Sequence, residues 1–250
     1  MWECRRAAWV MTSWLGLVCY AHGPSHVPNL RVPLPELCSA PNPVPKLSVP
    51  ALIPLSLLEA IRNLDTPVED GLDELAEEIA ARRLGLSPTV AAQIQRYRQA
   101  VDKGGSVDQD ETVSVLRLVG RRTDAHLVFA DAGRRAARYA YRRAASSRTL
   151  AKVSPGKVAH RLAMRSAARV ARAVFGGELN PRSQDLEVQM ESPLSIVALP
   201  TGEACVFYGS VYQELLRGLT GFEGAVIHER CRARGDNACV WRTAVAEVYE

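Results

Sequence analysis

Hydrophobic residues recur at helical spacing through the middle of the chain. Residues 72–79 carry apolar side chains three and four positions apart and predict a helix, with Gly85 placed to end it. Ser87-Pro88 is typical of a helix cap followed by a first helical residue, so a second helix is predicted over residues 88–103. Residues 112–119 fit either a strand or a short helix, because so short an apolar run does not define its period.

Two longer helices are predicted before the composition changes. Asp124 is placed to cap a helix that runs to about Ala145. Gly133, Ala137 and Ala140 would lie on one face of it, where their small size would let another backbone approach closely. A further helix is predicted over about residues 155–175, and the glycine pair that follows would close it.

The C-terminal part of the chain alternates apolar and polar residues. Residues 186–190 and 194–199 predict two strands, and residues 211–219 predict a helix. Residues 224–229 and 238–248 predict two strands that face each other across the turn Arg234-Gly-Asp-Asn237. Helices followed by an antiparallel sheet predict an α+β fold in which the helices pack on the sheet.

The N-terminal part of the chain differs from the rest in its high proline content. Nine of the fifteen prolines lie between Pro24 and Pro54, which predicts an extended linker, so we expect residues 1–54 to be a disordered extension. The apolar segment 7–20 follows two arginines and fits a secretory signal, an unstructured extension or a start codon placed too far upstream. It is shorter than the roughly 20 residues that cross a bilayer, so no stable membrane span is expected.

Composition and charge are those of a soluble globular protein. Hydrophobic residues make up 47% of the 250 residues, charged residues make up 23%, and the net charge is +4. The charge is unevenly spread, because residues 134–172 contain twelve Lys or Arg and no Asp or Glu. Within this segment Arg161, Arg165, Arg169 and Arg172 share one helix face, which predicts either a solvated surface or a site for carboxylate or phosphate. The segment lacks a nucleic-acid-binding signature, so no nucleic-acid partner is expected.

The cysteines indicate metal chemistry near the C-terminus. A turn at Gly235-Asp236 would bring Cys231 and Cys239 together, with His228 three residues before Cys231 and with Cys205 upstream. Three thiolates and one imidazole are a known set of zinc ligands. The spacing alone also fits buried free thiols or a Cys231–Cys239 disulfide. Six cysteines in a chain of this size are too few for a disulfide-dense secreted scaffold, and a cytoplasmic protein is expected.

The C-terminal motifs resemble the 4-vinyl reductase domain family. The likeness covers about residues 112–245 and is carried by Ser192-Pro193, Gly202-Glu-Ala-Cys205, Leu219-Thr-Gly221, and the run from Glu229 through Gly235-Asp236 and Cys239 to Trp241. The resemblance implies the ligand-binding fold of nitric-oxide-signalling and Golgi-transport proteins, which we assign to residues 106–250. The helices predicted before it from their periodicity form a helical lead-in over residues 55–105. The resemblance also implies a structural zinc that clamps the C-terminal hairpin.

Residue by residue, the resemblance implies Cys205, Cys231 and Cys239 as zinc ligands. The family's fourth ligand is acidic, whereas His228 stands at that position here, and Glu229, one residue later, competes for the role. Four protein ligands would leave zinc no open position, so a zinc-dependent hydrolase is not expected.

The resemblance also implies a ligand that is small, hydrophobic and often aromatic. A tetrapyrrole intermediate of bacteriochlorophyll biosynthesis, carried by the protein as an accessory factor of photosynthesis, would suit an apolar pocket and the carboxylate-binding arginines Arg161 and Arg165. Tyr208 and Tyr212 would either stack on such a planar ligand or belong to the core. Alternatives are a divinyl chlorophyllide reductase, for which the chain lacks a nucleotide, flavin or iron–sulfur motif, and a sensor for transcriptional regulation. Related ligand-binding domains often pair, so a homodimer is expected.

Overall fold

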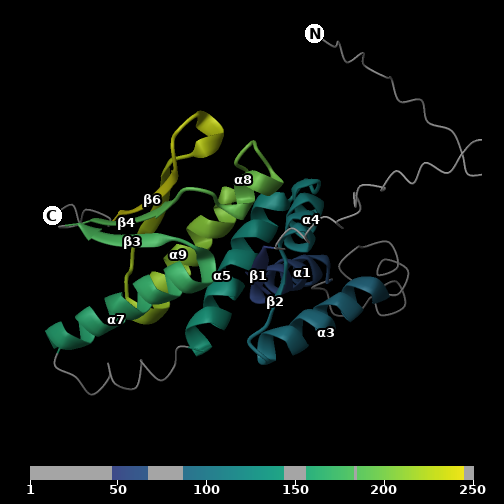
Figure 1. The fold of residues 1–250 in the computed structure, drawn as a ribbon, viewed down its shortest axis with the longest axis horizontal. Coiled ribbons are helices and arrows are strands. Elements are labelled where there is room, and N and C mark those ends of the chain that lie inside the picture. The colour runs from purple at the N-terminus through teal and green to yellow at the C-terminus, as the bar shows by residue number, and fades with distance from the viewer. Residues whose placement is uncertain (1–46, 67–86, 144–155, 183–184, 245–250) are drawn as a thin grey trace, which may run out of the picture. The chain divides into compact units, whose positions relative to one another are not determined.

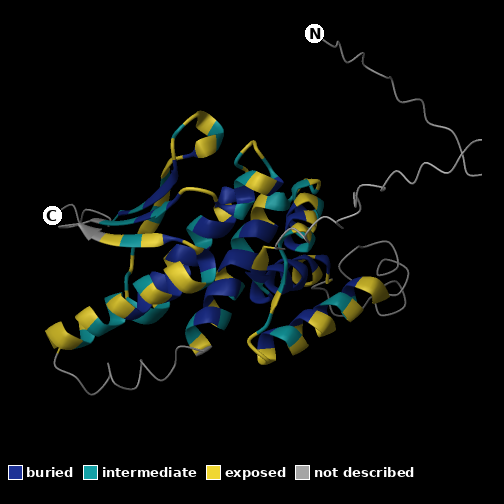
Figure 2. Cartoon of the chain, in the orientation of Figure 1, coloured by how far each residue is buried: buried dark blue, intermediate teal, exposed yellow. Residues whose placement is uncertain are grey.

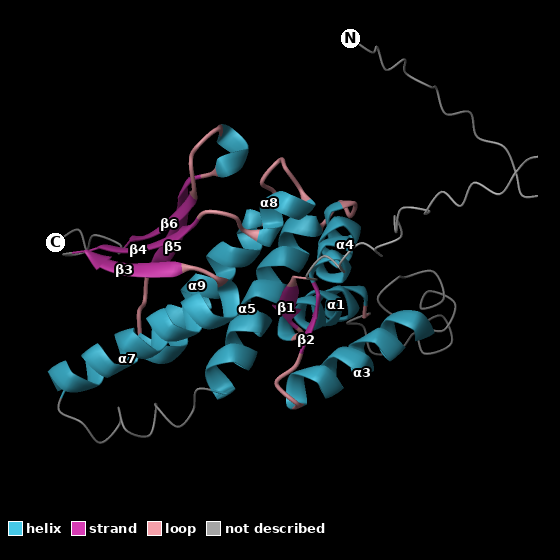
Figure 3. Ribbon diagram, in the orientation of Figure 1, coloured by secondary structure: helices cyan, strands magenta, loops and turns pink. Residues whose placement is uncertain are grey.

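Helices make up the first part of the fold and the main sheet comes late in the chain (Figures 1 and 3). The computed structural model describes residues 47–66, 87–143, 156–182 and 185–244. In chain order the elements are β1 (Ser48–Pro50), α1 (Leu52–Asp65), α3 (Pro88–Asp102), β2 (Ser106–Asp108), α4 (Gln109–Gly120), α5 (Ala125–Arg143), α7 (Gly156–Val170), η2 (Ala171–Phe175), β3 (Glu178–Arg182), β4 (Asp185–Met190), α8 (Leu194–Ala198), α9 (Cys205–Thr220), β5 (Ala225–Arg230), η3 (Arg232–Arg234) and β6 (Cys239–Ala244). The predicted α+β class is confirmed.

Helix α1 runs through the hydrophobic core. Every residue from Leu52 to Ile61 is buried, and Figure 2 draws most of the helix in the colour of buried residues. A helix that is apolar around most of its circumference must be covered on all sides, and α3, α4 and α5 pack against it. Pro54 is tolerated because it lies in the first turn, where the amide would have no partner within the helix.

The expected domain boundaries differ from the structure at this helix. Residues 48–54, expected to belong to a disordered extension, form β1 and the first turn of α1. The expected helical lead-in is not a separate layer either, because α1 packs on α5 and all described residues belong to one compact unit. The proline-rich pattern of residues 24–54 predicted an extended linker and so did not indicate that the fold begins at β1. Pro50 and Pro54 are nevertheless compatible with an edge strand and a first helical turn, respectively. Residues 1–46 and the helix predicted at residues 72–79 lie outside the described residues.

Helices α5 and α9 pack closely against each other. A Cβ atom added to Gly133 of α5 would lie 2.3 Å from the carbonyl oxygen of Phe207 in α9, so only glycine allows the two backbones to be this near. Ala137 and Ala140 on the same helix are also buried. The prediction that these small residues permit a close approach is confirmed.

The main sheet is antiparallel, with the strand order β3-β4-β6-β5. Its buried face carries Val188, Trp241 and Met190 toward the core, and α9 contacts β5. A second, two-stranded pair joins β1 to β2, with Val49 opposite Val107. Helix α9 and the β5–β6 hairpin thus meet on one side of the core, where the candidate site lies.

Several local predictions are confirmed. Helix α3 begins where the cap signal predicted, and the Ser87 hydroxyl accepts a hydrogen bond from the Val90 amide at 3.3 Å. Residues 112–119, which the sequence left ambiguous, are helical in α4. The helix predicted over residues 155–175 is α7 followed by a π-helical turn, and Gly176 ends it with a φ of 74°.

Other local predictions are wrong. Residues 194–199 were predicted as a strand, but residues 194–198 form the short helix α8, whose buried Ser195 and Ala198 are three positions apart, a spacing that suits a helix face. Helix α9 begins at Cys205, six residues before the predicted start, and strand β3 was not foreseen. The strand prediction for residues 194–199 failed because a short apolar segment does not define its own period and takes its conformation from the surface that covers it.

Candidate metal centre

Three cysteines and one histidine converge where α9 meets the β5–β6 hairpin. Cys205 is the first residue of α9, His228 lies in β5, Cys231 follows β5, and Cys239 begins β6. One potential ligand atom from each residue lies within 4.8 Å of those from the other three. The group could therefore hold a metal ion. The structure brings together all four residues that the sequence put forward as ligands.

The turn between Cys231 and Cys239 is built by its own hydrogen bonds. The Asp236 carboxylate accepts a hydrogen bond from the Cys231 amide at 2.7 Å. The Cys231 carbonyl accepts one from the Arg234 amide at 2.8 Å. Gly235 ends the short helix η3 with a φ of 95°, which favours glycine. The Cys239 sulfur accepts a hydrogen bond from the Arg232 amide at 3.5 Å, and it lies 3.9 Å from the Cys231 sulfur.

Cys205 reaches the hairpin because the loop before α9 passes very close to it. Gly202 has a φ of 83°, and a Cβ atom there would lie 2.9 Å from the Ala233 side chain and 3.1 Å from the Cys231 sulfur. The Ser195 hydroxyl of α8 contacts the Cys205 sulfur at 3.2 Å. A glycine that allows close approach and a hydroxyl neighbour therefore fix the position of the third thiol.

His228 has the properties of an available ligand. Its ring stacks on that of Trp241, with centroids 4.8 Å apart and an angle of 12° between the rings. Its Nε2 atom is buried and has no hydrogen-bond partner among the described residues. Burial, with a smaller contribution from Arg234, lowers the pKa of His228, which favours the neutral imidazole that binds metals.

Glu229, the competing candidate for the fourth ligand, does not join the cluster. Its carboxylate pairs with Arg242 at 3.1 Å, and its side chain is exposed. Strand residues point alternately to opposite faces, and a register shift between His228 and Arg230 isolates Glu229 further. The structure therefore favours His228 over Glu229.

A nearby cation would stabilise the thiolate form of the buried cysteines. Burial raises the pKa of Cys205 and of Cys239, because a thiolate in an apolar environment loses its hydration. A bound metal ion reverses this effect, since it stabilises the thiolate form directly. Three buried thiols beside a buried imidazole nitrogen without a partner are the donor set that a metal ion would satisfy.

The alternative of a Cys231–Cys239 disulfide fits less well. The two sulfurs are 3.9 Å apart, whereas a disulfide bond measures about 2.05 Å. Cys205, Cys231 and Cys239 are all free and buried. A disulfide would also leave the convergence of Cys205 and His228 on the same point unexplained.

The residues predicted to contact an organic ligand differ in their exposure to solvent. Arg161 and Arg165 are exposed on α7, as the solvated-surface interpretation of the arginine stripe predicted. Tyr208 and Tyr212 are buried in the core, where both rings pack against Trp241. The Tyr212 hydroxyl lies 2.8 Å from the Met190 sulfur. Of the two interpretations offered for these tyrosines, the structure agrees with the core.

The contacts of three neighbours with the candidate ligands were not predicted from the sequence. Ser195, Asp236 and Trp241 each contact one of the four residues or its backbone. Asp236 had a local signal, because an aspartate after glycine in a turn often accepts backbone amides. Ser195 had none, since its role depends on α8, which the sequence did not predict as a helix.

A groove lined by α3 and α4 offers the fold a different concave surface. It has a volume of about 760 Å³, and its apolar lining includes Leu58, Val90, Val115 and Leu118. Tyr97 and Glu111, joined by a hydrogen bond of 2.6 Å, form part of its polar lining. Its volume is within the range of about 300–1,000 Å³ that is usual for small-molecule sites.

Comparison with known proteins does not assign the chain to a family. No protein-family model matches it, and no curated protein matches it. Among the described residues, none of the helices combines the length and apolar character needed to cross a bilayer.

Proposed function

We propose that Cys205, His228, Cys231 and Cys239 bind a structural zinc ion. Three thiolates and one imidazole are ligands that zinc prefers, and four protein ligands give a closed tetrahedral site. Sulfurs bound to one tetrahedral zinc are about 3.8 Å apart for a Zn–S bond of about 2.3 Å. The Cys231 and Cys239 sulfurs, 3.9 Å apart, already have this separation.

The zinc would act as a cross-link. It would join the start of α9 to both strands of the β5–β6 hairpin, and such closed sites contribute to folding. With four protein ligands the ion has no open position for water or substrate, which argues against a hydrolase. The convergence of the four donor atoms is the observation that carries this proposal.

We further propose that the chain is a small-molecule-binding domain of the 4-vinyl reductase type. The supporting evidence is the sequence resemblance around the metal ligands together with the α3–α4 groove, whose apolar lining suits a hydrophobic or planar guest. Arg117 and Arg121 also line the groove and would attract a carboxylate on that guest. A tetrapyrrole intermediate of bacteriochlorophyll biosynthesis combines an apolar ring system with carboxylates and is the ligand class we favour.

The groove and the metal centre share a structural connection. Arg117 of α4 donates hydrogen bonds to the Ala198 and Val197 carbonyls of α8 at 3.2 and 3.4 Å. Helix α8 also carries Ser195, which contacts Cys205. A structural zinc would thus stabilise one support of the groove wall, and loss of the metal should weaken ligand binding as well as folding.

The test combines metal analysis with ligand titration. Purified protein should contain about one zinc per chain, and protoporphyrin IX at micromolar concentration should show a saturable absorbance shift. Ser114→Trp places a large side chain in the groove from an exposed position and should weaken binding at least about tenfold. Gln95→Trp, exposed on α3 and outside the groove lining, is the matched control.

The outcomes separate the alternatives. Absence of an absorbance shift, or equal effects of the two tryptophan variants, would remove the ligand proposal without affecting the zinc assignment. Turnover of a divinyl chlorophyllide in the presence of a nicotinamide donor would replace the carrier role with catalysis. Absence of zinc from protein purified without chelators would remove the metal assignment.

A further inference from the structure

A small polar pocket lies between α1 and α5. It has a volume of about 140 Å³ and is lined by Glu59, Arg135, Arg138, Tyr139 and Arg142. Every lining residue is charged or carries a hydroxyl group, in contrast to the apolar surroundings of α1. Arg135, Arg138 and Arg142 are three and four positions apart, which places them on one face of α5.

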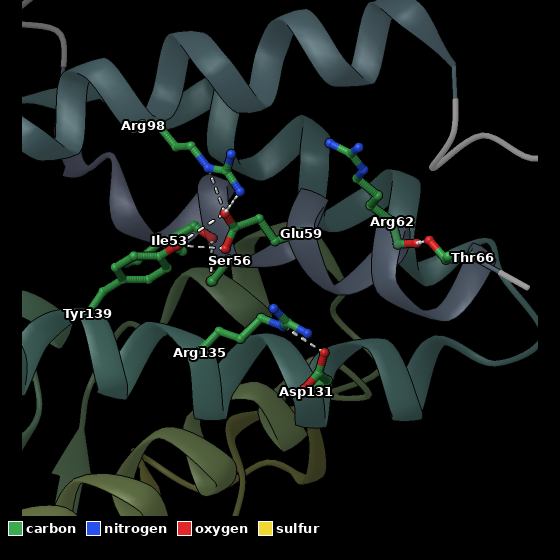
Figure 4. Close-up of polar contacts among 9 residues, drawn as sticks. All are labelled: Ile53, Ser56, Glu59, Arg62, Thr66, Arg98, Asp131, Arg135 and Tyr139. Atoms are coloured by element: carbon green, nitrogen blue, oxygen red, sulfur yellow. Dashed lines mark hydrogen bonds and ion pairs between the residues drawn. The ribbon is translucent and has the colours of Figure 1, made fainter. Parts of the chain in front are cut away.

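The negative charge in this pocket is already compensated. Glu59 is 7% exposed, and its Oε1 atom accepts hydrogen bonds from Nε and Nη2 of Arg98 at 3.0 and 2.7 Å. The Tyr139 hydroxyl lies 2.8 Å from the other carboxylate oxygen (Figure 4). Arg98 comes from α3 and does not line the pocket. The Glu59 carboxylate is therefore neutralised by an arginine from a neighbouring helix.

The arginines of α5 keep most of their donors available. Arg135 donates from Nε to Asp131 at 2.7 Å, as Figure 4 shows, and Arg138 donates from Nε to Glu214 at 2.8 Å. A guanidinium group has five N–H donors, and four of them are on the two terminal nitrogens. Within the described part of the chain, these terminal nitrogens of Arg135 and Arg138 make no hydrogen bond to the protein.

Among the described residues, one positive charge around the pocket has no acidic partner. Glu59, Asp131 and Glu214 pair with Arg98, Arg135 and Arg138, respectively. Arg142 also lines the pocket, and across residues 47–66, 87–143, 156–182 and 185–244 it forms no ion pair. The pocket therefore combines a surplus cation with several free N–H donors, whereas its carboxylate is already bound.

We propose that this pocket binds a small oxyanion, either phosphate or a carboxylate group. Guanidinium groups bind both oxyanions through paired N–H donors. The pocket is too small for the ring system proposed for the α3–α4 groove and has the size of a single anionic group. The ion pairs with Asp131 and Glu214 hold Arg135 and Arg138 in position, so the donors are oriented before the anion arrives. The site does not depend on the metal centre.

The test is a titration of the full chain with sodium phosphate and, separately, with sodium malonate. Binding is measured by isothermal calorimetry at constant ionic strength, with sodium chloride as the reference titrant. We expect saturable binding of at least one of the two anions, and the stronger one identifies the preferred group. Arg142→Gln should reduce its affinity about tenfold, because one charge-assisted contact is lost.

The matched control is Arg134→Gln. Arg134 lies on the same helix, is exposed and does not line the pocket, so this variant removes the same charge without touching the site. Arg134→Gln should bind the preferred anion with the same affinity as the unmodified protein. Both variants alter exposed residues, and circular dichroism should show that each melts like the unmodified protein.

Three results would overturn the proposal. The first is the absence of saturable binding for both anions. The second is an unchanged affinity in Arg142→Gln. The third is an equal loss of anion affinity in Arg142→Gln and Arg134→Gln. That result would show that binding depends on the overall charge of α5 and not on the pocket.

Discussion

Replacing Cys231 with serine tests the metal centre most directly. The serine side chain is nearly the same size as cysteine but is a poor zinc ligand, so the change removes one of four donors with little effect on packing. Cys231 also lies in the turn that positions Cys239, and the hydrogen bond from its backbone amide to the Asp236 carboxylate does not involve the Cys231 side chain. The backbone of the turn should therefore survive while the metal is lost.

The size of the effect follows from linkage between binding and folding. A metal present at 100 to 1,000 times its dissociation constant stabilises the folded state by about 3–4 kcal/mol. For a domain of this size, 1 kcal/mol shifts the melting temperature by about 2–4 °C. We therefore expect Cys231→Ser to melt about 6–16 °C below the unmodified protein and to contain no zinc.

The assay is thermal unfolding followed by circular dichroism, with zinc measured by mass spectrometry on the same samples. A chelator should lower the melting temperature of the unmodified protein and leave that of Cys231→Ser unchanged. Arg134→Gln is the control, since this exposed residue of α5 is not in the cluster and all four candidate ligands stay in place. If Cys231→Ser retained one zinc per chain and the original melting temperature, the metal assignment would be wrong.

Three further predictions concern the rest of the fold. Gly133→Leu should prevent native packing of α5 on α9 and give mainly insoluble protein on expression, because even its Cβ would lie 2.3 Å from the Phe207 carbonyl oxygen; a soluble variant with native melting would contradict the packing. Glu59→Gln should lower the free energy of unfolding by about 1–2 kcal/mol in urea titration, a modest loss because Arg98 is 47% exposed; an unchanged midpoint would show that this pair contributes nothing. The pKa of Asp124 is lowered, first by its hydrogen bond with Arg122, so its contribution to stability is present above its unfolded pKa of about 3.9 and is lost as pH falls below that value. Asp124→Asn should therefore be less stable than the unmodified protein at pH 7 and should approach it near pH 2, and a stability difference independent of pH would contradict this.

Much of the local structure could be predicted from the sequence because its causes are local. The Ser87-Pro88 cap determines where α3 begins, and the Gly235-Asp236 turn determines how β5 and β6 are joined. The cysteine spacing likewise indicated which residues could share one ion. These features depend on backbone conformation and hydrogen bonds within a few residues, which the order of amino acids specifies directly.

The choice among alternatives depended on the tertiary structure. His228 and not Glu229 faces the thiols because of strand alternation and the register shift in β5, and Tyr208 and Tyr212 are core residues because α9 is covered by the sheet. Residues 194–198 became a helix against α4 and α9 for the same kind of reason.

The sequence by itself determined the helix caps, the hairpin turn and the set of possible metal ligands. Only the tertiary structure decided that α1 lies in the core, that Cys205 meets the hairpin, and that three arginines of α5 share a pocket with Glu59. The physical reason is that burial and charge compensation depend on segments far apart in the chain. Their contributions are defined only once those segments pack together.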